Sequence, residues 1–520
     1  MDKPPLITAL LSPTCYPHAC SEIRLIETHI SWVILTGEYA YKIKKPLNLG
    51  FLNFDSLEKR HHYCKEELRL NQRLAPQIYR DVVAIYYDNQ HVFVAKQHPE
   101  AIEFAVRMNQ FSQTQMLESC LQRHSIENRH IEQLANDIAH FHLTISHHQI
   151  NTHHGSVSTI QHAMEDNFHH IKQCLPDTVL NELHQSTLKT YQSLQPMMEQ
   201  RLQRGFVREC HGDMHLGNMV MLEDRITLFD CIEFNPDFFW IDVMSDIAFL
   251  LMDLQQRGYS EWANYLLNHY LSNTGDYAGL PLLPLYQSYR AMVRAKVNAI
   301  LIQQHGDAKD QQTALESVNA YLQLAHQFIQ PSSGALIITR GLSGSGKSYL
   351  CQQLAPKLNA IHLRSDVERK RIFSMNANTD TCIPLTQKYY SPQANQTTYQ
   401  HLITISKLLI EHGFTVLVDA TFIAPEDIEH FQQLAAEKRC AFAILQLDAH
   451  PQQLHNNILQ RQQNTNDPSD ADLNVLTKQQ QRYQPLEENE SLIQHLWGDE
   501  IKNTLAKLQQ KLSNHPNKLN

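Results

Sequence analysis

The chain has 520 residues, of which 42% are hydrophobic and 19% are charged. These values exclude a disordered chain and predict several globular domains. No apolar run approaches the ~18 residues that a membrane-spanning helix needs, so none is predicted. Ten scattered cysteines without a CxxC pair are typical of a reducing compartment, and we therefore expect a cytoplasmic protein.

The net charge of −10 comes entirely from the first part of the chain. Residues 335–520 contain 18 Lys and Arg against 18 Asp and Glu, which leaves 26 against 36 for residues 1–334. Neither balance predicts the basic surface that binds nucleic acid, so we do not expect a nucleic-acid partner.

The front of the chain predicts a small sheet followed by helices. Residues 30–46 alternate around a turn at Gly37, which is typical of a β-hairpin. Residues 56–74 predict an amphipathic helix and residues 81–96 a second hairpin. Residues 111–203 have a mostly helical pattern, so we expect an α+β domain with a small lobe at about 25–105 and a large lobe at about 106–330.

The Pro-Ser-Ser-Gly link at residues 331–334 predicts a domain boundary. Before the link, residues 241–254, 283–303 and 313–330 predict helices. After it, short apolar strands alternate with helical segments, as a parallel α/β sheet requires. We therefore expect one domain at 1–330 and a second, of class α/β, at 335–520.

Residues 341–348, GLSGSGKS, match the phosphate-binding loop GxxxxGK[ST] between a predicted strand and a predicted helix. Glycines let backbone N–H groups point at phosphate oxygens, and the following helix adds its positive end. We expect the lysine to reach the β- and γ-phosphates of ATP and the serine hydroxyl to hold Mg²⁺. The predicted nucleotide-binding residues of this loop are Gly341, Gly344, Gly346, Lys347 and Ser348.

Four polar residues after this loop indicate a kinase rather than a motor or a switch. Asp366 and Arg369 follow a predicted strand, where α/β domains bind their ligands. Asp366 can accept a hydroxyl proton, and Arg369 can neutralise phosphate. Asp419 ends another strand and can hold Mg²⁺, while Arg461 suits a lid that closes over phosphates.

Residues 207–234 contain a second group of candidate catalytic residues. Asp213 and Asn218 have the D-x-x-x-x-N spacing of a kinase catalytic loop, and Asp230 follows an apolar strand. Phosphoryl transfer needs a carboxylate that orients the attacking hydroxyl, and oxygen ligands for Mg²⁺ on the phosphates. We expect Asp213 to be the base and Asn218 and Asp230 to bind the metal.

The stretch HGDMHLGN at 211–218 resembles the HGDxHxxN signature of aminoglycoside phosphotransferases and their choline- and sugar-kinase-like relatives. The resemblance covers roughly residues 25–330 and implies a bilobal, protein-kinase-like fold. It implies the same roles for Asp213, Asn218 and Asp230. It also implies that His211 and His215 brace the loop.

The same resemblance implies an ATP-binding lysine on the first hairpin, and Lys42 occupies the matching position. Lys44 lies on the same face of the strand and is an alternative. On the following helix we expect Glu67 to be the ion-pair partner of the lysine, with Glu66 as the alternative.

Residues 335–500 resemble small P-loop kinases that phosphorylate metabolites or polynucleotide 5′-hydroxyls, such as the zeta-toxin and gluconate-kinase types. The whole chain resembles a bacterial fusion of the two kinase types. One departure is the sequence APEDIEH at 424–430, where an arginine commonly follows the motif in relatives. One phosphate or substrate contact of the family therefore lacks its counterpart here.

We expect a bifunctional enzyme with two ATP·Mg²⁺ sites, each of which transfers the γ-phosphoryl group to a hydroxyl of a small molecule. The resemblance implies an aminoglycoside-, sugar- or choline-like acceptor for the first half and an unidentified metabolite for the second. One alternative is a nucleotide-regulated binding protein in which one kinase half is idle. Another is a polynucleotide 5′-hydroxyl kinase in the second half.

Overall fold

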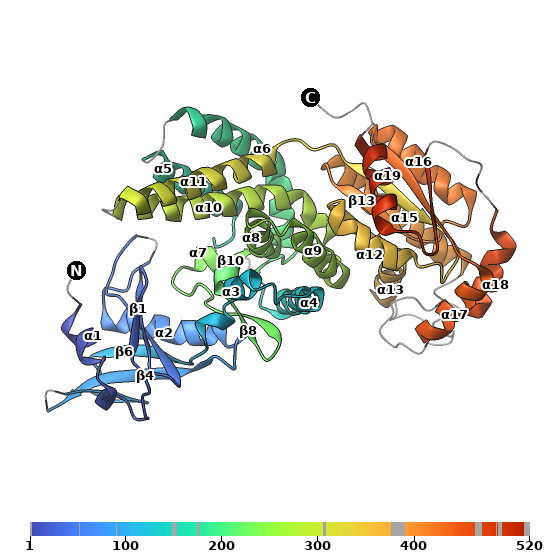
Figure 1. The fold of residues 1–520 in the computed structure, drawn as a ribbon. Helices are drawn as coiled ribbons and strands as arrows, with labels where there is room; N and C mark the ends of the chain where they lie inside the picture. Colours follow the sequence, from blue (N-terminus) through green and yellow to red (C-terminus); the bar gives the residue numbers. More distant parts are fainter. Residues whose placement is uncertain are drawn as a thin grey trace. The chain divides into compact units, whose positions relative to one another are not determined.

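The computed structural model describes residues 3–50, 52–89, 91–147, 153–173, 177–304, 308–375, 391–462, 471–484, 486 and 491–513. The chain packs into two compact units, and Figure 1 shows the elements that form them. Unit 1 comprises Met1–Asp253 and Tyr289–Tyr321, and unit 2 comprises Leu254–Ser288 and Leu322–Asn520. Residues 254–288 therefore precede the predicted link but pack with the C-terminal part of the chain. The boundary at 331–334 stays a prediction.

Unit 1 begins with an antiparallel sheet of six strands in the order β1-β2-β3-β6-β4-β5, drawn in blue in Figure 1. Both predicted hairpins are confirmed, since β2 pairs with β3 and β4 pairs with β5. The predicted helix is α2 (Leu57–Asn71), which packs on β6 and β4. The strands are β1 (Arg24–Glu27), β2 (Ser31–Leu35), β3 (Tyr39–Lys44), β4 (Tyr79–Asp88), β5 (His91–Ala95) and β6 (Glu103–Asn109).

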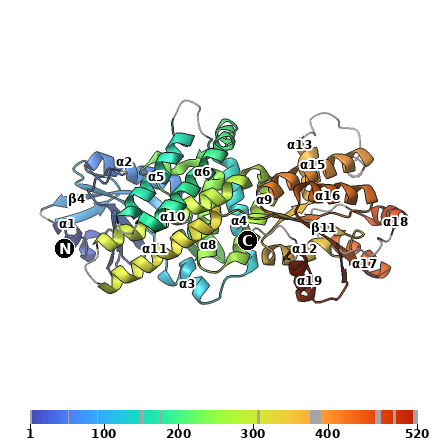
Figure 2. The ribbon, with the colours of Figure 1, turned by 90° about the horizontal axis from the view of Figure 1, so that it is seen from above.

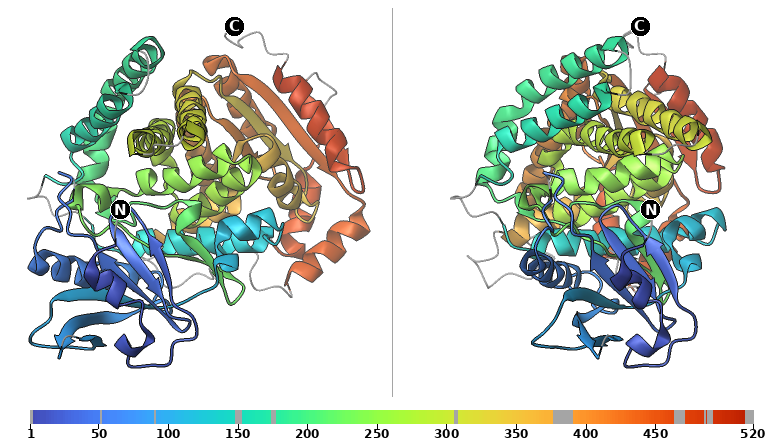
Figure 3. Two further views of the ribbon diagram at one scale, coloured as in Figure 1. Left: turned by 60° about the vertical axis from the view of Figure 1, so that its left-hand side comes forward. Right: turned by 90° about the vertical axis from the view of Figure 1, so that its left-hand side faces the viewer.

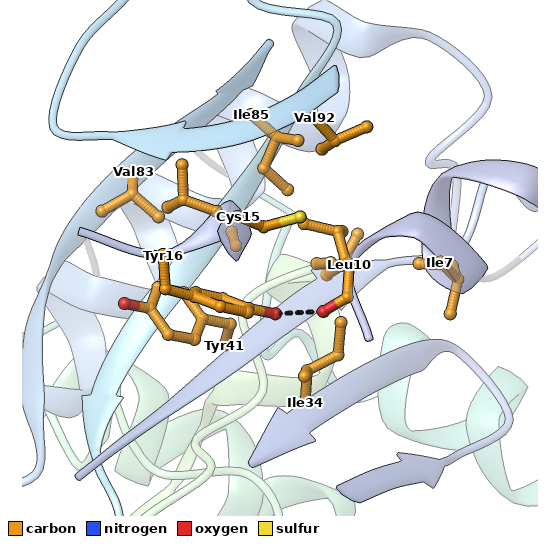
Figure 4. Close-up of a cluster of buried hydrophobic side chains, with 12 residues drawn as sticks. Ile7, Leu10, Cys15, Tyr16, Ile34, Tyr41, Val83, Ile85 and Val92 are labelled. Carbon is orange, nitrogen blue, oxygen red and sulfur yellow. Dashed lines mark hydrogen bonds between the residues drawn. The ribbon is translucent and has the colours of Figure 1, made fainter. Parts of the chain in front are cut away.

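A buried apolar cluster holds the N-terminal segment against this sheet (Figure 4). Ile7 of α1 (Pro5–Ala9) packs in the same cluster as Ile34 of β2. The Tyr16 hydroxyl donates to the Leu10 carbonyl at 2.7 Å, so its polar end is satisfied inside the cluster. Removing these side chains from water stabilises the sheet that carries the predicted ATP-binding lysine.

Helices form most of the remainder of unit 1, as the pattern of residues 111–203 predicts. Two short antiparallel pairs lie among them, β7–β10 and β8–β9. Figure 3 shows α5 and α6 side by side. The elements are α3 (Leu117–Gln122), α4 (Asn128–Thr144), α5 (Val157–Lys172), α6 (Asp177–Gln203), β7 (Val207–Glu209), β8 (Met219–Leu222), β9 (Arg225–Leu228), α7 (Pro236–Phe239), β10 (Trp240–Asp242), α8 (Val243–Gln256), α10 (Leu283–Gln304) and α11 (Ala308–Ile329).

Unit 2 contains a parallel sheet in the order β12-β13-β11-β14-β15, as the strand–helix alternation predicts. Helices α15 and α16 cover one face, and α12 and α19 cover the other (Figure 2). The strands are β11 (Ala335–Arg340), β12 (Ala360–Arg364), β13 (Thr415–Asp419), β14 (Ala441–Asp448) and β15 (Leu492–Leu496). The helices are α12 (Lys347–Lys357), α13 (Ser365–Met375), α15 (Pro392–Glu411), α16 (Pro425–Lys438), α17 (Pro451–Gln462), α18 (Leu473–Arg482) and α19 (Ile501–Ser513).

Two elements of unit 2 were not predicted. Strand β15 is short and lies at the edge of the described sheet, where it pairs with β14. Helix α9 (Ser260–Thr274) contains several Asn, Ser and Thr residues, which lower the helix propensity of a segment. Packing against the rest of unit 2 stabilises both elements, and such packing is not visible in a local pattern.

In the described part of the chain, none of the helices combines the length and the apolar content that crossing a membrane requires. The cysteines in these residues carry free thiols. All but one of them, Cys20, are buried.

Candidate active sites

The predicted catalytic residues of unit 1 meet at one end of the β8–β9 hairpin. Asp213 lies in the loop after β7, and Asn218 ends the short helix η3 (Leu216–Asn218). The Asn218 side-chain amide donates to the Asp213 carboxylate at 2.8 Å. The Phe229 N–H donates to the Asn218 carbonyl at 3.0 Å, so Asp230 directly follows the residue that pairs with Asn218.

The surroundings of Asp213 keep its side chain ionised. Burial raises its pKa, but His215 and then His211 and Arg294 outweigh burial and lower the pKa below the ordinary range. His215 Nε2 lies 3.3 Å from the Asp213 carboxylate, whose side chain is still 33% exposed. A partly exposed, ionised carboxylate can orient an attacking hydroxyl and accept its proton.

Carboxylates of helix α8 bind backbone N–H groups of the loop that contains Asp213. The Asp246 carboxylate accepts hydrogen bonds from the backbone N–H groups of His211 at 3.0 Å and Gly212 at 2.9 Å. Asp253, further along the helix, accepts from the Leu216 N–H at 2.9 Å. Burial raises the pKa of Asp246, but hydrogen bonds from His142 and the His211 backbone lower it to about 2.

Asp246 and Asp253 were not predicted from the sequence, although the sequence contains a pattern that indicates their role. They are the only charged residues of α8, whose other side chains are almost all apolar. Residues seven apart lie on one face of a helix, and a buried carboxylate needs donors. Two acidic residues on one face of an apolar helix therefore indicate a segment whose amides they bind.

A buried ion-pair network connects β3, α2 and the segment after Asp230. Lys42 Nζ lies 2.8 Å from one oxygen of Glu67 and 2.5 Å from Asp230. Lys44 Nζ lies 2.6 Å from the other oxygen of Glu67 and also contacts Glu233. Burial raises the pKa of Glu67, but the two lysines outweigh burial and lower it.

The network bears on the two choices that the sequence left open, between Lys42 and Lys44 and between Glu67 and Glu66. Lys42 contacts the predicted metal ligand Asp230, whereas Lys44 is 1% exposed and enclosed by Glu67 and Glu233. Glu67 contacts both lysines, whereas Glu66 pairs with Arg69 at the surface. The arrangement favours Lys42 and Glu67 for the ATP site. Glu233 carries no motif spacing that the sequence reasoning could have used.

The second predicted site lies between β11 and α12. Gly344 and Gly346 both have φ of 86°, a conformation that side chains disfavour. A Cβ on Gly344 would lie 2.8 Å from the Leu454 carbonyl oxygen. Lys347 Nζ donates to the carbonyls of Gly341 at 3.0 Å and Leu342 at 2.8 Å, so its ammonium lies over the loop.

A cavity of about 1080 Å³ opens beside this loop. Seven predicted residues line it, and α16 and α18 contribute further polar side chains that the sequence reasoning missed, among them Asp427 and Lys478. These residues lie on the polar faces of amphipathic helices, where nothing in the pattern separates them from ordinary surface residues. The predicted residues in the lining are Gly344, Gly346, Lys347, Ser348, Asp366, Arg369 and Asp419.

Of the two remaining predicted residues of this half, Gly341 does not line the cavity. Gly341 instead supports the loop through its carbonyl. Arg461 belongs to α17, but its side chain lies outside the described residues.

Both sites offer ligands that suit Mg²⁺, a hard cation that binds oxygen. In unit 1 these are the amide of Asn218 and the carboxylate of Asp230. In unit 2 they are Ser348 and Asp419, whose side chains hydrogen-bond to each other. Burial raises the pKa of Asp419, but His362 and then Arg364 and Ser348 lower it to about 2, so the carboxylate is ionised.

Residues 64–283 match a model described as phosphotransferase enzyme family, and residues 336–486 match one described as AAA domain. Uncharacterized proteins of Mycobacterium tuberculosis and Mycobacterium bovis are 26% identical over 443 residues, which are 84% of this chain and 86% of the relatives. The GDP and kanamycin complex of APH(2")-IIia is 12% identical and covers 61% of this chain and 98% of its own, with a TM-score of 0.39. A putative kinase from Chloroflexus aurantiacus is 21% identical and covers 35% of this chain and 100% of its own, with a TM-score of 0.29.

The Glu67→Gln substitution should destabilise unit 1. The substitution removes the negative charge that both buried lysines contact. This loss should lower the free energy of unfolding by about 3 kcal/mol. The matched control is Glu66→Gln, which breaks only a surface pair and should cost less than about 1 kcal/mol. Urea denaturation of the full chain measures both, and equal losses would contradict the role of the network.

The Asp246→Asn substitution should change how stability depends on pH. The folded pKa of about 2 lies below the ordinary value of 3.8, so the carboxylate stabilises the fold above pH 4. This contribution, about 2 kcal/mol, is lost as the pH falls from about 4 to about 2. The difference in stability between variant and wild type should shrink over that range in acid denaturation. A constant difference would count against the assignment.

The Gly344→Ala substitution should weaken nucleotide binding by at least about 10-fold, because the new Cβ forces the loop backbone to move away from Leu454. Gly498→Ala is the matched control, since Gly498 has φ of 98° but no atom within 4 Å of the position that a Cβ would take. Binding of a fluorescent ATP analogue with Mg²⁺ measures the effect. The prediction fails if both variants bind the analogue equally well.

Proposed function

We propose that this chain, which joins a phosphotransferase-family kinase domain to a P-loop kinase domain, transfers the γ-phosphoryl group of ATP to hydroxyl acceptors at two separate sites. The two family matches make it an ATP-dependent kinase. The separate activities of the halves and their acceptors are our proposal. The free, mostly buried thiols agree with a reducing, cytoplasmic setting.

In the first site, Asp213 orients the acceptor hydroxyl and takes its proton. Asn218 and Asp230 would hold Mg²⁺, which would neutralise the charge that develops on the phosphates. Lys42 lies next to Asp230 and would contact the phosphates from the small lobe. Glu67 keeps this lysine in place from α2.

One observation carries the proposal for this site. The base, both oxygen ligands and the lysine come from β3, the catalytic loop and the hairpin that follows it, yet a chain of contacts connects them. Asn218 donates to Asp213, Phe229 just before Asp230 donates to Asn218, and Lys42 contacts Asp230. Such an arrangement supports transfer to a small hydroxylated molecule, of which an aminoglycoside-, sugar- or choline-like compound is the class we propose.

In the second site, the backbone of residues 341–348 would receive the phosphates and Lys347 would neutralise them. Ser348 and Asp419 would hold Mg²⁺, Asp366 would take the proton of the acceptor hydroxyl, and Arg369 would contact phosphate. We keep Arg461 as a proposed lid residue. The cavity lined by Lys347, Ser348, Asp366, Arg369 and Asp419 leaves room for a metabolite beside the nucleotide.

Asp213→Ala and Lys347→Ala test whether the halves act separately. Screening of the purified full chain for ATP consumption against hydroxylated metabolites should yield two acceptors. Each variant should lower the rate of phosphorylation of one acceptor by about 100-fold or more. The rate with the other acceptor should stay unchanged. If only one activity is found and both variants lose it, the two halves are coupled in a single activity. The proposal of two separate enzymes is then wrong.

A further inference from the structure

The edge of the P-loop sheet is closed by a helix from far upstream in the sequence. Among the residues that the structure describes, β12 is the last strand on its side of the sheet, since it pairs there only with β13. Helix α9, which belongs to unit 2, packs against β12 and α12. The phosphotransferase match includes α9, so unit 2 combines residues from both family segments.

Asn268 of α9 binds β12 as a neighbouring strand would. Its side-chain oxygen accepts from the His362 N–H at 2.7 Å, and its side-chain nitrogen donates to the Ala360 carbonyl at 3.0 Å. These two groups point outward from the edge of the sheet, where an unpaired strand leaves its polar groups exposed. Asn264, one turn earlier, also donates to the Ala360 carbonyl, at 3.1 Å.

His362 extends this contact to the proposed magnesium ligand. Its side chain is 5% exposed, and its Nε2 lies 3.2 Å from the carboxylate of Asp419. Asp419 in turn hydrogen-bonds to Ser348 at the start of α12. The path from α9 to the metal site therefore consists of Asn268, the backbone and ring of His362, and Asp419.

A second contact attaches α9 to the helix that carries Asp366 and Arg369. Arg371 of α13 donates to the Ser272 carbonyl at 2.8 Å, near the C-terminal end of α9. A cation at this end of a helix is favourable because the unpaired carbonyls carry partial negative charge. This second contact therefore holds α13, whose Asp366 and Arg369 line the P-loop cavity.

We propose that α9 completes the P-loop site, with Asn268 as a positioning residue that acts through His362 on Asp419. The inference rests on the proposed function of that site. It explains a property of the fusion, because the second kinase half needs a helix that precedes the link. Partners behind a metal ligand typically contribute 10- to 100-fold to metal affinity.

The test uses the full chain with Lys42→Met, which weakens nucleotide binding at the first site. Asn268→Ala should raise the Mg²⁺ concentration for half-maximal binding of a fluorescent ATP analogue by about 10-fold or more. The matched control is Glu261→Gln, which breaks the exposed pair between α9 and Lys357 and should leave this value unchanged. Equal values for wild type and Asn268→Ala, or an equal rise in the control, would overturn the proposal.

Substitutions of His362 distinguish positioning from a general loss of stability. His362→Gln keeps a donor that can reach Asp419 and should retain most of the Mg²⁺ affinity, whereas His362→Leu should lose it. If both substitutions behave alike while both variants melt like wild type, the path through His362 is wrong.

Hydrogen exchange provides a readout that does not depend on nucleotide binding. In Asn268→Ala the amide of His362 should lose protection, while the amides of β13 stay protected. A chain that binds no nucleotide at all would refute the proposed function of the site. Unchanged protection of His362 would refute the role of Asn268 even then.

Discussion

Buried carboxylates that accept from more than one donor determine the positions of the functional groups in both units. Glu67 contacts two lysines, and Asp246 accepts two backbone N–H groups of the catalytic loop. Asp419 contacts His362 and Ser348. Removing such a charge from water costs several kcal/mol unless partners compensate, so each carboxylate favours only the packing that supplies them. The geometry of the sites follows from this constraint.

The two sites apply the constraint to different parts of the chain. In unit 1 the groups proposed to act on ATP are side chains from a strand, a loop and a hairpin. Buried ion pairs fix the positions of these side chains relative to one another. In unit 2 the phosphates are proposed to meet main-chain amides, whose directions depend on backbone conformation. The glycines with positive φ and their close neighbours then set the directions of these amides.

Much of the proposed catalytic machinery could be expected from the sequence because its members are close together in the chain. Asp213 and Asn218 share one loop, and the phosphate-binding loop is a single run of residues, so spacing alone indicates their chemistry. Alternation and periodicity also located the hairpins and the parallel strands, because side-chain direction follows directly from backbone geometry. The choice between Lys42 and Lys44 was beyond that reasoning, since both lie on one face of β3. It depends on which of them reaches Asp230, almost 190 residues away in the chain.

The sequence by itself determined the fold class of each half and the local motifs that imply phosphoryl transfer, because these depend on neighbouring residues. Only the tertiary structure decided which distant groups support those motifs. Asp246 behind the catalytic loop and Asn268 at the sheet edge act through hydrogen bonds to backbone atoms. Every residue has those backbone atoms, so no pattern of residue types can identify the partner before the chain is folded.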